Sequence, residues 1–74
     1  MSEISLDLRG LKCPLPALRV AKTLIGLASG DLVVVECTDP LAAIDIPNLL
    51  RQTGDILEDQ GQSNGALTFR IRKR

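Results

Sequence analysis

One of the two cysteines of this chain, Cys13, is followed by Pro14, Leu15 and Pro16, within the segment LRGLKCPLP. Proline is favoured in the first turn of a helix, where its missing N–H would have no partner and its fixed φ suits the helix. We therefore expect a helix that begins with Pro14 and has Cys13 as its N-cap residue. The free N–H groups and the helix dipole at that position favour a thiolate and would lower the pKa of the thiol.

Three cations near Cys13 in the sequence, Arg9, Lys12 and Arg19, would favour a thiolate in the same way. The chain has no histidine to act as the base of a cysteine hydrolase. Two cysteines are too few to hold zinc, and no Cys-x-x-Cys pair is present. The chemistry that remains is a nucleophilic thiolate that other proteins load and unload. A sulfur held there as a persulfide fits this chemistry, and we expect no metal and no other cofactor.

Length and composition indicate one domain, residues 1–74, with an apolar content of 45% that is typical of a globular chain. The longest strongly apolar run, LVVV, is too short to cross a bilayer, and the N-terminal residues do not resemble a signal peptide. We therefore expect a cytoplasmic protein without a membrane partner.

The last fourteen residues are basic, but the single aromatic residue, Phe69, alternates with polar residues and is expected inside. Nucleic acid is accordingly not an expected partner.

Hydrophobic periodicity predicts strands and helices in the order β-α-β-α-β-β, which is an α+β fold. Right-handed crossovers would place both helices on one face of a four-stranded mixed sheet. In the first helix Leu18 and Ile25 fall on the apolar arc, whereas Leu15 falls among polar residues. In the second, Pro47 is expected to interrupt the helix, with Asp45 as the N-cap. The expected elements are a strand at 4–8, a helix at 14–29, a strand at 31–37, a turn at 40–44, a helix at 46–53, a strand at 55–60, an Asn-Gly reversal and a strand from 66.

The segment LDLRGLKCPLPALRVAK closely resembles the Cys-Pro-x-Pro signature of the TusA family of SirA-like proteins. The segment TDPLAAIDIPNLL resembles the second signature of that family, and the resemblance covers nearly the whole chain. It implies a two-layer α/β sandwich and a sulfur carrier that accepts sulfane sulfur on Cys13 as a persulfide. The family implies a cysteine desulfurase or other sulfurtransferase as donor and a downstream relay protein as acceptor, serving tRNA thiolation, molybdenum cofactor synthesis or sulfur metabolism. Such a protein is a component of a sulfurtransferase system more than a stand-alone enzyme.

The residues that match the second signature, together with two residues of the first helix, are candidates for a partner-facing surface. The first helix offers Leu15 as an apolar anchor with Lys22 beside it. At position 15 the family often has an acidic or otherwise variable residue. The candidates from the second signature are Asp39, Pro40, Asp45 and Pro47. We expect the carrier to be a monomer.

Two other functions stay open. The first is a thiol-disulfide redox protein that cycles Cys13 with Cys37. Cys37 shares a strand face with Val33 and Val35, so burial as an inert packing residue is the simpler interpretation. The second is a regulatory module that has no chemistry of its own.

Overall fold

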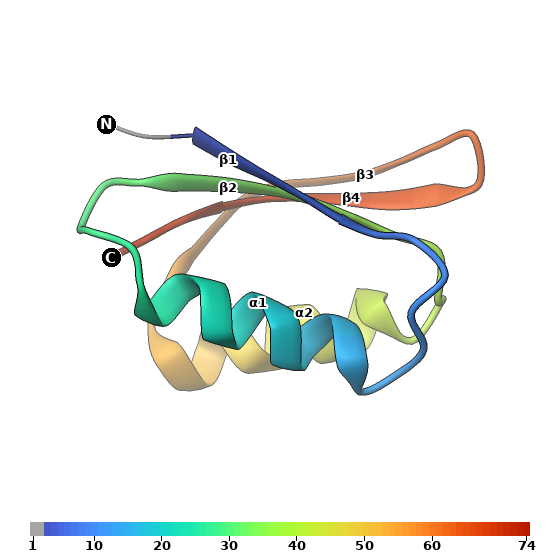
Figure 1. The fold of residues 1–74 in the computed structure, drawn as a ribbon, viewed down its shortest axis with the longest axis horizontal. Helices are drawn as coiled ribbons and strands as arrows, with labels where there is room; N and C mark the ends of the chain where they lie inside the picture. Colours follow the sequence, from blue (N-terminus) through green and yellow to red (C-terminus); the bar gives the residue numbers. More distant parts are fainter. Residues whose placement is uncertain (1–2) are drawn as a thin grey trace.

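The computed structural model describes residues 3–74, which form six elements in the order β-α-β-α-β-β (Figure 1). The order, the mixed sheet and the placement of both helices confirm the fold expected from the sequence. Neither helix within the described residues is long and apolar enough to cross a membrane. The elements are β1 (Glu3–Leu8), α1 (Leu15–Ile25), β2 (Leu32–Cys37), α2 (Ala42–Thr53), β3 (Ile56–Ser63) and β4 (Ala66–Arg72).

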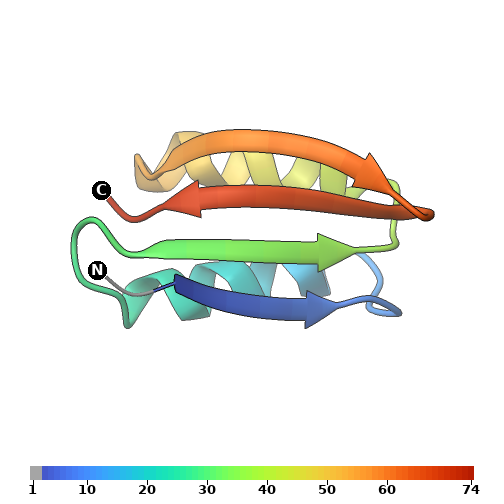
Figure 2. The same cartoon turned by 90° about the horizontal axis from the view of Figure 1, so that it is seen from above.

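The sheet has the strand order β1-β2-β4-β3. Strands β1 and β2 are parallel, whereas β4 is antiparallel to both of its neighbours. Figure 2 shows α1 and α2 side by side on one face of the sheet, with α1 behind β1 and β2 and α2 behind β3 and β4. Because β1 and β2 are parallel neighbours, the loops that leave their carboxyl ends open at the same edge of the sheet.

The core lies between the sheet and the two helices. Strand register places apolar side chains in rows across the sheet, because residues paired across neighbouring strands point to the same face. Helix α1 adds Pro16, Val20 and Leu24 to the core, at a spacing of four residues. The rows are Ile4, Val33, Ile71 and Leu57; then Leu6, Val35 and Phe69; then Leu8, Cys37 and Leu67.

Helix α1 is shorter than expected and begins later. Its N-cap is Pro14, with φ −96° and ψ 15°, so the first helical residue is Leu15 and the expected N-cap at Cys13 is wrong. The helix ends at Ile25, and Gly26 is the C-cap. Leu18 and Ile25 are exposed although they fall on the predicted apolar arc. Only the face of α1 that carries Pro16, Val20 and Leu24 is buried, so the buried stripe of the helix is narrower than its arc of apolar residues.

Helix α2 runs unbroken from Ala42 through Pro47, which corrects the expected turn at 40–44 and the N-cap at Asp45. The N-cap is Leu41, without a side-chain hydrogen bond, and Asp45 lies in the first turn. A proline inside a helix loses one backbone hydrogen bond. Burial of Ala42, Ile46 and Leu50 on both sides of Pro47 outweighs that loss and holds the helix together.

Strand β3 extends to Ser63, three residues beyond the expected strand at 55–60. The second half of β3 is exposed and polar, so its hydropathy does not indicate a strand. Pairing with β4 extends the strand to Ser63. The expected Asn-Gly reversal is confirmed. Asn64 and Gly65 both have positive φ, at 51° and 78°, as a tight two-residue hairpin loop requires.

A pair of substitutions tests which face of α2 is buried. Ile46 is fully buried, whereas Ile44, two residues earlier in the same helix, is 59% exposed. We expect Ile46→Ala to lower the free energy of unfolding by about 2–5 kcal/mol, since it leaves a cavity. Ile44→Ala is the matched control and should change stability by less than about 0.5 kcal/mol. Urea denaturation measures both, and similar losses for the two variants would contradict the assigned face.

Candidate functional site

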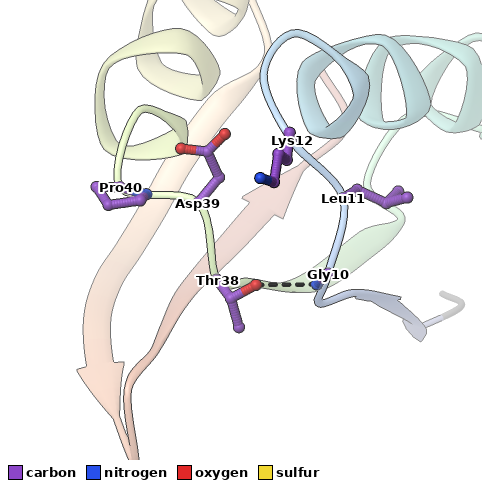
Figure 3. Close-up of a pocket in the computed structure, with 6 residues that line it drawn as sticks. All are labelled: Gly10, Leu11, Lys12, Thr38, Asp39 and Pro40. Atoms are coloured by element: carbon purple, nitrogen blue, oxygen red, sulfur yellow. Dashed lines mark hydrogen bonds between the residues drawn. The ribbon is translucent and has the colours of Figure 1, made fainter.

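Two loops meet at the edge of the sheet where β1 and β2 end. The loop after β1 carries Cys13, and the loop after β2 carries Thr38 and Asp39. The Gly10 backbone N–H donates a hydrogen bond of 2.9 Å to the Thr38 hydroxyl and ties the loops together (Figure 3). Between them lies an open hollow of about 320 Å³. It is lined by Gly10, Leu11, Lys12, Thr38, Asp39 and Pro40.

Asp39 joins the loop of the thiol to the start of α2. One carboxylate oxygen accepts the backbone N–H of Cys13, and the other accepts the backbone N–H of Leu41 at 3.0 Å. These two backbone hydrogen bonds, with the nearby charge of Lys12, hold the pKa of the Asp39 carboxyl below its usual value. Asp39 is therefore ionised at neutral pH and fixes the backbone of Cys13 against α2.

The Cys13 thiol is exposed and donates a hydrogen bond to the Asp45 carboxylate, which projects from the first turn of α2. This hydrogen bond raises the pKa of the Cys13 thiol, and partial desolvation and the charges of Asp45 and Asp39 add to the effect. The expected lowering of the pKa is therefore wrong. Cys13 lies two residues before α1, and its own N–H is bound to Asp39, so the helix terminus does not stabilise a thiolate.

The cations that the sequence suggested as supporting residues do not gather at the thiol. Arg9 forms an ion pair with Asp7, with 2.8 Å between Nε and Oδ1. The ammonium group of Lys12 points toward Asp39 in Figure 3. The third, Arg19, lines a separate hollow, and so does Lys22, the cation expected on the partner-facing surface. The other residues of this hollow are Ile4, Thr23, Gly26 and Leu27. That hollow lies toward the beginning of β1, whereas Cys13 follows the end of that strand.

The four prolines of the two signatures occupy different environments. Pro14 is exposed and is joined to Cys13 by a cis peptide bond, whereas Pro16 lies in the first turn of α1 and is fully buried. Pro40 is exposed and lines the hollow, and Pro47 lies inside α2. Pro16 thus belongs to the core and not to an open surface beside the thiol.

Four large apolar side chains stand exposed where α1 and α2 begin, on either side of the loop that carries Cys13. Leu15 is 48% exposed, so its predicted place outside the core is confirmed. Leu18 is exposed as well, although the helical period placed it on the buried arc. The four residues, called the apolar rim below, are Leu15, Leu18, Leu41 and Ile44.

Cys37 is fully buried within the core, as its strand position predicted. Burial raises the pKa of its thiol to about 11, with a smaller contribution from the charge of Asp39. Cys37 is therefore a packing residue in this structure and a poor nucleophile. Among residues 3–74, no group of three or more cysteine, aspartate or glutamate side chains is arranged to hold a metal ion.

Sequence analysis identified both signatures but missed two residues of the site, Gly10 and Thr38. A signal for them exists in the strand register. Leu8 pairs with Cys37, so the residues that follow each strand come side by side, and Thr38 is the first polar residue there.

Comparison with known proteins identifies the family of this chain. Residues 4–73 match the family described as "Sulfurtransferase TusA". The chain belongs to the TusA family. Over 68 residues it is 41% identical to the sulfur carrier protein TusA of Allochromatium vinosum, covering 92% of this chain and 90% of that one. It is 36% identical over 69 residues to TusA of Pseudomonas putida, covering 93% and 86%. The crystal structure of a SirA-like protein from Desulfitobacterium hafniense superposes with a TM-score of 0.82 at 26% identity, covering 93% and 95%.

The site geometry predicts an unusual pH profile for alkylation. Iodoacetamide should modify Cys13 before Cys37, because only Cys13 is exposed. Alkylation of Cys13 should reach half of its maximal rate at a higher pH than alkylation of a free cysteine does, because its thiol pKa is raised. Peptide mass spectrometry across a pH series measures both rates. Half-maximal alkylation below the pH of a free cysteine would contradict the contact between Cys13 and Asp45.

Proposed function

We propose that this TusA-family protein is a sulfur carrier that holds sulfane sulfur as a persulfide on Cys13. The observation that carries the proposal is the exposed Cys13 thiol on a loop at the edge of the sheet, with its backbone N–H held by Asp39. Proteins named sulfur carriers that are about two-fifths identical over nearly the whole chain support the same function.

Sulfur transfer of this kind needs no cofactor other than the sulfur itself. The Cys13 sulfur attacks the outer sulfur of a persulfide on the donor, and the bond between the two donor sulfurs breaks. The electron pair of that bond stays on the donor cysteine, which takes up the proton that Cys13 has lost. One thiol and one persulfide are consumed and one of each is formed, so no oxidant or reductant is required.

The partners follow from this reaction. A cysteine desulfurase or another sulfurtransferase supplies the persulfide, and a downstream relay protein accepts it for tRNA thiolation, molybdenum cofactor synthesis or sulfur metabolism. We propose that the single domain acts as a monomer and as a component of that system. The apolar rim beside Cys13 is the surface on which both partners dock, since aliphatic side chains around a reactive group exclude water once they are covered.

Sulfur loading tests the proposal directly. Reduced protein incubated with glutathione persulfide, or with a cysteine desulfurase and cysteine, should gain the mass of one sulfur atom, and dithiothreitol should remove it. Cys13→Ser should abolish the gain, whereas Cys37→Ala should retain it. Intact-mass spectrometry gives the result. Loss of two hydrogens in place of a gain of sulfur would identify a Cys13–Cys37 disulfide and a redox protein.

A second test concerns the apolar rim. Leu15→Glu should slow sulfur transfer from a protein donor, because it places a charge in the docking surface, and should leave the transfer from glutathione persulfide unchanged. Stability should change by less than about 0.5 kcal/mol, since the side chain is half exposed. Ile25→Glu is the matched control, because Ile25 is exposed at the opposite end of α1. Equal slowing by both substitutions would remove the rim from the docking surface.

A further inference from the structure

The contact between Asp45 and Cys13 is chemically unexpected for a thiol that has to become a nucleophile. Asp45 belongs to α2, and 32 positions in the sequence separate it from Cys13. Its carboxylate accepts the hydrogen bond of the thiol itself, whereas the neighbouring Asp39 carboxylate is occupied by two backbone N–H groups. Asp39 therefore has a structural role, and Asp45 is the carboxylate in contact with the reacting sulfur.

A carboxylate in contact with a thiol stabilises the protonated form, because ionisation would place two negative charges side by side. The charged groups that face the site are Asp45 from α2, Asp39 from the loop after β2 and Lys12 from the loop after β1. The charge of Lys12 helps to lower the pKa of Asp39, whereas the pKa of the Cys13 thiol is raised. In the free protein the local charge thus works against the reaction that the exposed position of Cys13 permits.

We infer that Asp45 is a specificity-determining residue, which keeps Cys13 as the unreactive thiol until a reaction partner brings a positive charge beside the sulfur that Cys13 attacks. This inference rests on the proposed function for its biological meaning, but the chemistry can be tested without a sulfur donor. A cation next to the reacting sulfur pairs with Asp45, and the hydrogen bond from the thiol is lost. The Cys13 proton then passes to water, and the thiolate attacks. The leaving thiolate takes up a proton, so the net reaction is the exchange already described.

The charge of Asp45 selects among reaction partners of equal intrinsic reactivity. A cationic group approaching the site is attracted by Asp45, and it also removes the restraint on the thiol. A neutral partner leaves the restraint in place, and an anionic partner is repelled. The sulfur donor and acceptor that this site fits are therefore proteins with a lysine or arginine side chain next to the reactive cysteine.

Thiol–disulfide exchange with three small disulfides of different charge provides the test. The reagents are cystamine, which is dicationic, 2-hydroxyethyl disulfide, which is neutral, and 3,3′-dithiodipropionate, which is dianionic. In each case the Cys13 thiolate attacks one sulfur and the other leaves as a thiolate, so Cys13 ends in a mixed disulfide. The rates are divided by those of free cysteine with the same reagents, which removes the reactivity of each disulfide.

We expect the unmodified protein to react several-fold faster with cystamine than with the neutral disulfide, and slowest with the dianion. Asp45→Asn, which keeps the size of the side chain without its charge, should raise the rate with the neutral disulfide several-fold and reduce the preference for cystamine. Asp45→Glu should restore the preference. Asp59→Asn is the matched control, because Asp59 is an exposed carboxylate on β3, the strand at the opposite edge of the sheet from β1.

Two results would overturn the inference. One is a rate with the neutral disulfide that does not rise in Asp45→Asn while circular dichroism shows the variant folded. The other is a preference for cystamine that added sodium chloride leaves unchanged in the unmodified protein, since salt screens a surface charge and this readout needs no variant. Failure of the proposed function has a different signature. The charge preference would then be present, but no persulfide donor would load Cys13.

Discussion

The site depends on one carboxylate, that of Asp39, which binds the backbone on both sides of the gap between two loops. It accepts the N–H of Cys13 and the N–H of Leu41, so the loop that carries the thiol and the first turn of α2 are fixed to a single group. Because the pKa of Asp39 is lower in the folded protein, ionisation of this carboxyl stabilises the fold. The stabilisation is fully present above the usual pKa of an aspartate and is lost as the pH falls through the lowered value.

The rest of the fold brings Asp39 within reach of Cys13. Parallel pairing of β1 with β2 sets Leu8 beside Cys37, so the two chains leave the sheet together. Packing of Ala42 and Ile46 against the sheet then holds the first turn of α2 beside the loop and keeps Asp45 in contact with the sulfur. The uncharged residues of the core therefore determine where the charged groups Asp39 and Asp45 lie relative to the thiol.

The sequence was sufficient for the features that local patterns determine, and insufficient for those that distant residues determine. Alternating and helical periods predicted the order of the elements, and the Asn64-Gly65 turn and the burial of Cys37 were recognisable from a few residues each. The start of α1 and the pKa of Cys13 were predicted wrongly. Both depend on contacts between residues 26 and 32 positions apart, and the spacing of residues within a loop or helix does not contain that information.

The same contacts bear on the loaded state of the carrier. A persulfide on Cys13 extends one atom beyond the thiol sulfur, and its ionised form would place a negative charge near Asp45 and Asp39. In the persulfide carrier that we propose, the two carboxylates therefore favour the protonated persulfide, whose outer sulfur an acceptor thiolate attacks. The restraint from Asp45 thus acts on the free thiol before it accepts sulfur, and not on the sulfur that it later gives up. Exposure of the thiol and restraint of its reactivity are thus compatible, because the first comes from the loop and the second from a carboxylate on another helix.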